Sequence, residues 1–189
     1  MMEKGKIIKN GNVNLENLVV ISSGTTSFKN LKLLNSNEVK EEFDEKWALN
    51  KAVEAAKNSN CKSQRGVVLW HRETGLYSSG YNAPPLPFVC DGSDKCRTNC
   101  SKTAVHAEQL ALMEALNWFD FNRLYECEMI HVKIVDGLPV VSEKPSCWQC
   151  SKLILAAGLK SMWLYQKEGF VEYSAYDFHR ITLENCDLM

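Results

Sequence analysis

Hydrophobic and polar positions alternate along the chain with two different periods. Between Asn37 and Asn58 the apolar residues recur at helical spacing, which predicts a helix with one buried face. The apolar run at 66–70, the turn residues at 73–75 and the short run that ends at Asn82 predict a β-hairpin. Later segments predict a helix at 103–119, a strand at 128–137, a helix at 146–158, a strand at 159–165 and a helical tail within 172–189.

Residues 83–101 interrupt this pattern between the hairpin and the next helix. They contain three prolines and Gly92, which predict a long loop without a regular element. A loop of this length inside a compact domain is usually functional or held together by a metal. We therefore expect it to lie beside a site.

The predicted elements follow one another as a helix, two strands and then alternating helices and strands. This order favours an α/β fold in which helices cover the faces of a sheet. Residues 1–36 hold only weak strand-like runs, broken by Gly24 and Asn35. We expect an N-terminal extension at 1–36 and one main domain at 37–189.

Composition narrows the classes of protein that the chain can belong to. Its 189 residues can bury a substantial core, and a net charge of −1 provides no overall positive field for a long polyanion. The apolar runs are too short to span a bilayer, and the N-terminus lacks the apolar segment of a secretory signal. We expect a cytoplasmic protein with no membrane partner.

Eight cysteines form two tight clusters and three outlying positions. In a cytosolic chain, close spacing favours metal ligation over disulfides. One cluster is Cys90, Cys96 and Cys100 in the long loop, and the other is Cys147 and Cys150 at the start of a predicted helix. Both clusters are therefore candidate metal sites.

The second cluster gains a partner in His106, which lies with Glu108 near the start of the preceding helix. One imidazole and two thiolates supply three zinc ligands and leave the fourth tetrahedral position for water, as catalytic zinc sites do. Zinc lowers the pKa of such a water to about 7, and a nearby carboxylate such as Glu108 can accept its proton and deliver it elsewhere. A CxxC pair alone often has a structural or redox role, but its combination with His-Ala-Glu favours a catalytic site.

These motifs resemble the zinc-dependent cytidine deaminase superfamily, whose signature is H-x-E followed by P-x-C-x-x-C. Within it the chain is most similar to the deoxycytidylate deaminases, which share the Gly66-Val67-Val68 strand, the Gly80-Tyr81-Asn82 segment and Val105-His106-Ala107-Glu108. The resemblance covers about residues 40–168. It implies a three-layer α/β/α sandwich with a central mixed sheet, zinc held by His106, Cys147 and Cys150, and Glu108 as the catalytic acid and base.

The sequence departs from the family at two positions. Ser146 separates Pro145 from Cys147, where the family has proline directly before the first cysteine. Leu110 occupies a position that is commonly asparagine in deoxycytidylate deaminases, and this part is more similar to tRNA adenosine deaminases. The substrate therefore stays open between a free cytosine nucleotide and a base within a nucleic acid.

The resemblance also bears on the substrate and on the cysteine loop. Asn82 is expected to contact the substrate, although asparagine also favours turns. Cations near the motifs are candidates for a 5′-phosphate site, namely Lys62, Arg65, Lys95, Arg97 and Lys102. Some relatives hold a second, structural zinc in this region, so Cys90, Cys96 and Cys100 are candidate ligands, with Cys61 or His71 as the fourth.

We expect an enzyme that deaminates a dCMP-like nucleotide to the uracil form and releases ammonia. The alternatives are a deaminase that acts on tRNA or single-stranded DNA and a zinc module without activity. The expected partners are zinc and a small-molecule nucleotide, with nucleic acid as the weaker alternative. Self-assembly into a homo-oligomer stays open, because the apolar segments of the last two helices would serve equally as core.

Overall fold

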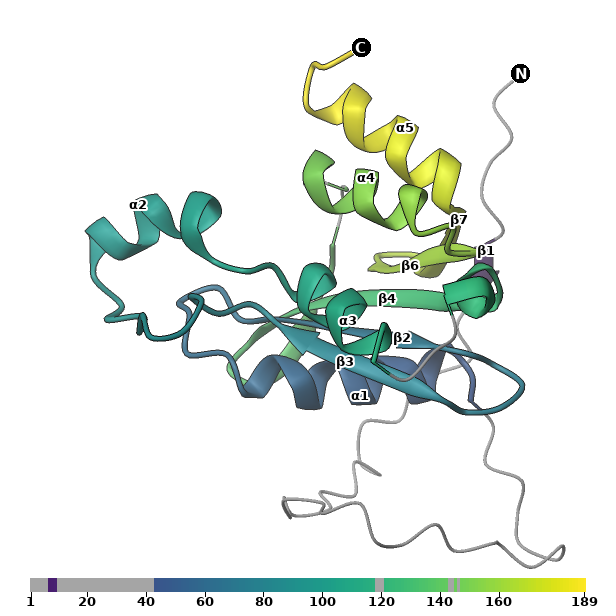
Figure 1. Ribbon diagram of the computed structural model, residues 1–189, viewed down its shortest axis with the longest axis horizontal. Helices are drawn as coiled ribbons and strands as arrows, with labels where there is room; N and C mark the ends of the chain where they lie inside the picture. The colour runs from purple at the N-terminus through teal and green to yellow at the C-terminus, as the bar shows by residue number, and fades with distance from the viewer. Residues whose placement is uncertain (1–6, 10–42, 118–120, 143–144, 146) are drawn as a thin grey trace, which may run out of the picture.

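A mixed β-sheet forms the middle layer of the structure, with helices on both of its faces (Figure 1). The computed structural model describes residues 7–9, 43–117, 121–142, 145 and 147–189. Within these residues the strand order is β1-β7-β6-β4-β2-β3, and β5 pairs with β4. The strands are β1 (Ile7–Lys9), β2 (Arg65–Trp70), β3 (Tyr77–Tyr81), β4 (Glu128–Val135), β5 (Leu138–Val140), β6 (Ser161–Gln166) and β7 (Gly169–Ser174).

The helices divide between the two faces of the sheet. The first helix, α1 (Glu45–Lys57), covers one face, and α3 (Ala107–Ala115), α4 (Trp148–Ala156) and α5 (Ala175–Asn185) cover the other (Figure 1). A short 3₁₀ helix, η2 (Phe121–Glu126), leads into β4. Strands β4 and β6 are parallel, whereas the remaining pairs are antiparallel. The sheet is therefore mixed, as the resemblance implies.

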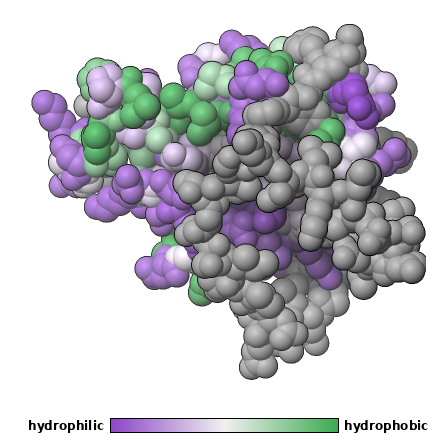
Figure 2. Space-filling view, turned by 60° about the horizontal axis from the view of Figure 1, so that its bottom comes forward, coloured by the Kyte–Doolittle hydropathy of each residue, from purple (hydrophilic) through white to green (hydrophobic). Residues whose placement is uncertain are grey.

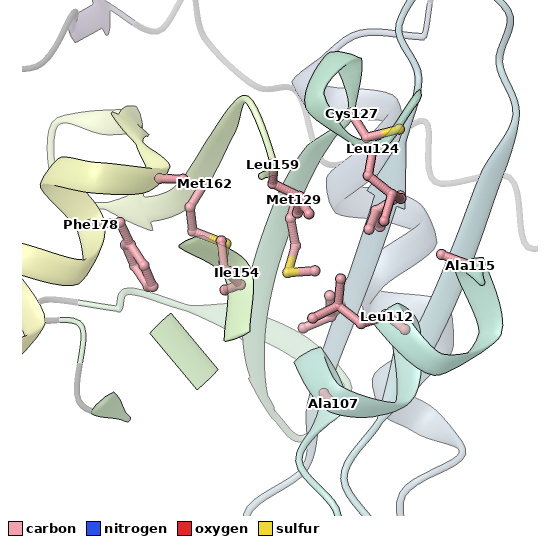
Figure 3. Packing of buried hydrophobic residues seen from close by; sticks show 14 of the residues in the cluster. Ala107, Leu112, Ala115, Leu124, Cys127, Met129, Ile154, Leu159, Met162 and Phe178 are labelled. Carbon is pink, nitrogen blue, oxygen red and sulfur yellow. The ribbon is translucent and has the colours of Figure 1, made fainter. Parts of the chain in front are cut away.

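Alternation along the central strands produces two separate hydrophobic cores. Val67, Leu69 and Met129 point toward α3 and α4, and Figure 3 shows Met129 among Leu112, Ile154 and Met162. The neighbouring residues Val68, Trp70 and Ile130 point the other way and pack under α1. Because successive strand residues face opposite sides, one apolar run serves both layers.

Two glycines allow helices to approach the sheet closely. A Cβ atom at Gly66 would lie 2.0 Å from the carbonyl oxygen of Ala52 in α1. A Cβ atom at Gly80 would lie 2.2 Å from the carbonyl oxygen of Ala107, the first residue of α3. Both distances are far below van der Waals contact, so any side chain at these positions would push a helix away. Gly80 thus sets how near the start of α3 comes to β3.

Most of the predicted elements are confirmed, but the loop at 83–101 was predicted wrongly in its second half. Residues Asp94–Thr103 form a helix, α2. The prolines end at Pro87, and Ser93 caps the helix by accepting a hydrogen bond from the backbone N–H of Cys96 at 3.1 Å. Consequently the next helix begins at Ala107 rather than near residue 103. Strand β7 was also missed, because the tail was predicted as helix alone.

The loop before α2 and α2 itself extend from the body of the structure (Figure 1). In this loop Leu86, Phe88 and Val89 are largely exposed. Figure 2 shows hydrophobic residues gathered on the same side of the molecule. Among the described residues no helix is long and apolar enough to cross a membrane.

The expected N-terminal extension lies mostly outside the described residues. Its described part, Ile7–Lys9, pairs with β7 and adds an edge strand to the sheet. The boundary between extension and main domain at residue 36 stays a prediction.

Candidate metal centre and active site

The starts of α3 and α4 lie close together on one face of the sheet (Figure 1), and each carries candidate metal ligands. His106 is the residue before α3, and its backbone N–H donates to Oε1 of Gln109 at 2.9 Å. Cys147 precedes α4, and its sulfur accepts a hydrogen bond from the backbone N–H of Cys150 at 3.5 Å. Helix N-termini stabilise thiolates, so the local backbone favours the ionised form of Cys147.

The structure brings the three predicted zinc ligands together. Nδ1 of His106 lies 3.3 Å from Sγ of Cys147 and 3.3 Å from Sγ of Cys150. In a tetrahedral zinc site, nitrogen and sulfur ligands lie about 3.5 Å apart. In the described part of the chain, this is the one group of three whose ligand atoms all lie within 4.8 Å of one another. The donor set and its spacing therefore fit zinc.

The two sulfurs cannot both ionise without a cation between them. Hydrogen bonds from Cys150 and from His106 lower the pKa of Cys147 to about 4. The pKa of Cys150 is raised, because its thiol donates to the Cys147 thiolate and because it is buried. A divalent cation would remove this conflict, since it binds both sulfurs as thiolates.

Glu108 lies beside these ligands and is only 6% exposed. Oε1 of its carboxylate lies 3.5 Å from Nδ1 of His131. Burial acts to raise its pKa, but the neighbouring histidines and Arg65 outweigh this effect and the net direction is downward. The ionised carboxylate suits a group that accepts a proton.

A cavity of about 720 Å³ opens above this group. Pockets of this size are typical for small molecules of nucleotide dimensions. The three candidate ligands, Glu108 and Trp148 are among its lining residues, and Trp148 is 40% exposed. The remaining lining includes Asn82, Lys62, Arg65, His131 and Lys133. The candidate ligands and Glu108 therefore share one cavity with several cationic side chains.

Three cations line the cavity. Arg65 on β2 and Lys133 on β4 stand directly opposite each other in the antiparallel register, and Lys62 lies nearby in the chain. Like charges in directly opposed positions destabilise a sheet. Within the described residues none of the three forms an ion pair with a carboxylate. Their charge is thus available for an anionic group. Lys133 was missed in the sequence, whereas Lys95 and Lys102 do not line the cavity.

Asn82 lines the cavity but also ties the surrounding loop together. Its Oδ1 accepts from the backbone N–H of Arg65 at 2.8 Å and from the hydroxyl of Ser59 at 3.0 Å. Its Nδ2 donates to the carbonyl of Ser63 at 2.9 Å. Within the described residues the second N–H of the amide has no acceptor, so it is a candidate donor to a ligand. The side chain therefore has a structural role, and its contact with substrate stays a prediction.

The cysteines of the α2 region come together as two close pairs. Sγ of Cys90 lies 3.4 Å from Sγ of Cys96, and Sγ of Cys100 lies 3.9 Å from Sγ of Cys61. The structure thus brings Cys61, not His71, to the loop. His71 lies past the far end of β2, where it contacts Glu126 and Thr74.

His131 is a second site residue, besides Lys133, that sequence reasoning missed. It lies on β4 with its side chain toward the cavity, between Glu108 and Arg65. A signal was present in the strand, because Ile130, Val132 and Ile134 are aliphatic while His131 and Lys133 alternate with them. Polar residues on the inward face of a buried strand indicate a site or a buried network.

Comparisons with solved structures find several deaminases. The cytidine deaminase from Burkholderia pseudomallei superposes with a TM-score of 0.51 and 17% sequence identity, over 71% of this chain and 95% of that chain. The dCMP deaminase from the cyanophage S-TIM5 in apo form gives 0.45 and 24%, over 62% and 78%. The cytidine deaminase from Mycobacterium leprae gives 0.42 and 14%, over 67% and 91%.

No protein-family model matches the chain, and neither does the sequence of any curated protein. At 17% identity the similarity to the Burkholderia enzyme concerns the fold. The described part of the chain has helices on both faces of a mixed sheet (Figure 1), which is consistent with that similarity. The chain therefore has the cytidine-deaminase-like fold, an α/β/α sandwich around a mixed sheet.

Proposed function

We propose that this protein is a zinc-dependent hydrolytic deaminase that converts a cytosine nucleotide such as dCMP to the uracil form. One observation carries the proposal. The candidate ligands His106, Cys147 and Cys150 converge in a cavity that is also lined by the buried carboxylate of Glu108. The fold shared with a cytidine deaminase supports it.

The side chains divide the chemistry between them. His106, Cys147 and Cys150 would hold the metal through one nitrogen and two sulfurs. When bound, zinc acts as a Lewis acid that makes water a nucleophile near neutral pH. The carboxylate of Glu108 then accepts a proton from water and delivers protons to the ring nitrogen and to the leaving amine. The reaction thus consumes one water, replaces the exocyclic amine of cytosine by a carbonyl group, and releases ammonia.

The charge on the cavity wall favours a nucleotide over a nucleoside. Lys62 and Lys133 line the cavity without a carboxylate partner in the described part of the chain. A 5′-phosphate would neutralise the repulsion between Lys133 and the opposing Arg65. Asn82 would contact the sugar or base through its remaining N–H.

The test is to measure ammonia release by the zinc-loaded full chain with dCMP, CMP, deoxycytidine and cytosine. We expect dCMP or CMP to be the best substrate. Glu108→Gln is expected to lose about 10³-fold in kcat, in line with the loss of a proton-transfer group, and to retain its zinc. Glu114→Gln in the same helix is the matched control. Absence of ammonia release from all four compounds would contradict the proposal.

A second candidate function is the deamination of a base within a nucleic acid. The exposed ring of Trp148 beside the cavity supports it, with Nζ of Lys152 5.0 Å from the ring centroid. Aromatic surfaces flanked by cations stack on the bases of single strands. A single-stranded DNA or tRNA substrate that outperforms dCMP in the same assay would favour this function.

The four cysteines near α2 form a second metal site in this proposal. Cys61, Cys90, Cys96 and Cys100 would hold a structural zinc as four thiolates. Their arrangement in two close pairs that line the same cavity supports this role. The buried thiol of Cys61 has its pKa raised to about 12 by burial and by Cys100, so a cation is needed to ionise it. Such a zinc would fasten α2 to the loop that precedes β2.

A further inference from the structure

Three polar side chains in contact with one another line the cavity: Arg65 at the start of β2, His131 on β4, and Glu108, the candidate acid and base. Nη1 of Arg65 on β2 lies 3.4 Å from Nε2 of His131 on β4. Nδ1 of the same imidazole lies 3.5 Å from Oε1 of Glu108 on α3. All three residues line the cavity. These contacts therefore connect β2, β4 and α3 beside the candidate metal ligands.

The chemistry of the groups fixes the direction of the hydrogen bonds. A guanidinium has only donors, so Nε2 of His131 must accept from Arg65. In a neutral imidazole the other nitrogen, Nδ1, then carries the proton, and Nδ1 is the ring atom that lies 3.5 Å from Oε1 of Glu108. The 3.5 Å separation is long for a hydrogen bond, and we expect it to shorten when substrate binds.

The surroundings of His131 favour the neutral imidazole. Burial lowers the pKa of His131, and the charge of Arg65 acts in the same direction against the opposing effect of Glu108. The side chain is only 13% exposed, and a protonated imidazole beside a guanidinium would add a second buried positive charge. The neutral imidazole with its proton on Nδ1 is thus the form compatible with both Arg65 and Glu108.

We propose that His131 positions the carboxylate of Glu108 by donating Nδ1–H to Oε1, and that Arg65 holds His131 in the required tautomer. This inference rests on the proposed deaminase function. With Oε1 anchored, Oε2 is left for the proton transfers to the substrate. Orientation of a catalytic group by a second residue is a recurrent device, and a misplacement of about 1 Å can cost roughly 100-fold in rate.

The first test reads the tautomer without any deamination. We would record ¹⁵N-labelled histidine spectra of the zinc-loaded full chain and assign the His131 signals by their loss in His131→Asn. The expected result is a neutral ring with the proton on Nδ1, and a mixture of tautomers in Arg65→Met. A ring protonated on Nε2 in the wild-type protein would overturn the proposal, whether or not the protein deaminates cytosine nucleotides.

The second test separates positioning from a merely structural role. Asparagine keeps an N–H donor bonded to Cγ, as Nδ1 is, whereas leucine has none. We expect His131→Leu to lose about 100-fold in kcat with little change in KM, and His131→Asn to recover most of that loss. Zinc content should equal that of the wild type in both variants. Equal kcat values for the asparagine and leucine variants would overturn the proposal.

His71→Leu provides the matched control. His71 is also a buried histidine that contacts a glutamate, but it lies past the end of β2 that is remote from the cavity. Its variant should be less stable to denaturant and have unchanged kcat. If the wild-type chain shows no deamination, the proposed function fails, and the tautomer measurement still decides the arrangement of Arg65, His131 and Glu108.

Discussion

Gly80 and Ala107 approach so closely that the first turn of α3 rests directly on β3. A Cβ atom at position 80 would lie 2.2 Å from the Ala107 carbonyl oxygen and 2.5 Å from the backbone nitrogen of Ala111. His106 precedes and Glu108 follows Ala107 in the chain. The absence of a side chain at Gly80 therefore determines where the candidate metal ligand and the candidate acid and base are held.

We predict that Gly80→Ala weakens both the fold and the metal site. The added methyl group would overlap backbone atoms of Ala107 and Ala111, which cannot move without the helix, so α3 must move away from β3. Overpacking of this kind costs about 2 kcal/mol of unfolding free energy, measurable by urea denaturation. Zinc affinity should fall as well, because His106 moves relative to Cys147. Ser79→Ala on the neighbouring position is the control and should affect neither, and normal zinc affinity in Gly80→Ala would contradict this account.

Local patterns predicted much of the fold because the central strands are short apolar runs bounded by turn residues. The hairpin of β2 and β3 and the end of α4 before Gly158 follow directly from such signals. Helix α2 could not be predicted in the same way. Its sequence, DKCRTNCSKT, has no apolar stripe, and its Ser93 cap follows a proline-rich stretch that reads as loop.

The site shows a similar division. His106, Glu108, Cys147 and Cys150 belong to compact motifs, so the chain itself indicates them. His131, Arg65 and Lys133 belong to two strands that pair only in the folded sheet, and their register cannot be read from either strand alone. The pairing of Cys61 with Cys100 depends likewise on tertiary structure. The two residues are far apart in the sequence, but their Sγ atoms lie 3.9 Å apart in the fold.

Lys133→Met should reduce the preference for a phosphorylated substrate. Loss of one charge-assisted contact to a 5′-phosphate would raise KM for dCMP about tenfold or more, while KM for deoxycytidine should not change. The comparison of KM for both substrates by ammonia release checks this. Lys46→Met, at an exposed position of α1, is the control. A parallel change with both substrates would show that Lys133 supports the site in another way.

Cys61→Ser should remove the second zinc and leave the first. The wild-type chain is expected to carry two zinc ions per molecule and the variant one, as measured by elemental analysis after gel filtration. Because the four-thiolate site would fasten α2, we also expect faster proteolysis within residues 94–103. Cys186→Ser is the matched control and should retain both ions. A wild-type content of one zinc would contradict the second site.

The carboxylate of Glu128 should make stability depend on pH. It is 1% exposed and accepts from Arg72 Nη2 at 2.7 Å, from Lys160 Nζ at 2.9 Å and from Trp163 Nε1 at 2.8 Å. Burial acts to raise its pKa, but the hydrogen bonds from Arg72 and Lys160 outweigh burial and lower it. A lowered pKa in the folded state stabilises the protein at neutral pH, and this contribution is lost as the pH falls below the unfolded value of about 4.3.

Glu128→Gln should therefore cost about 3 kcal/mol of unfolding free energy at pH 7, because two cations lose their buried partner. The difference from the wild type should shrink as the pH falls below about 4.3 and through the lowered pKa of the folded state, since the wild-type carboxylate becomes protonated there. Urea denaturation at several pH values measures both effects. Glu54→Gln, which removes an exposed pair with Lys51, should change stability by less than about 0.5 kcal/mol. A Glu128→Gln difference that is independent of pH would mean that packing, not the charge, accounts for the loss.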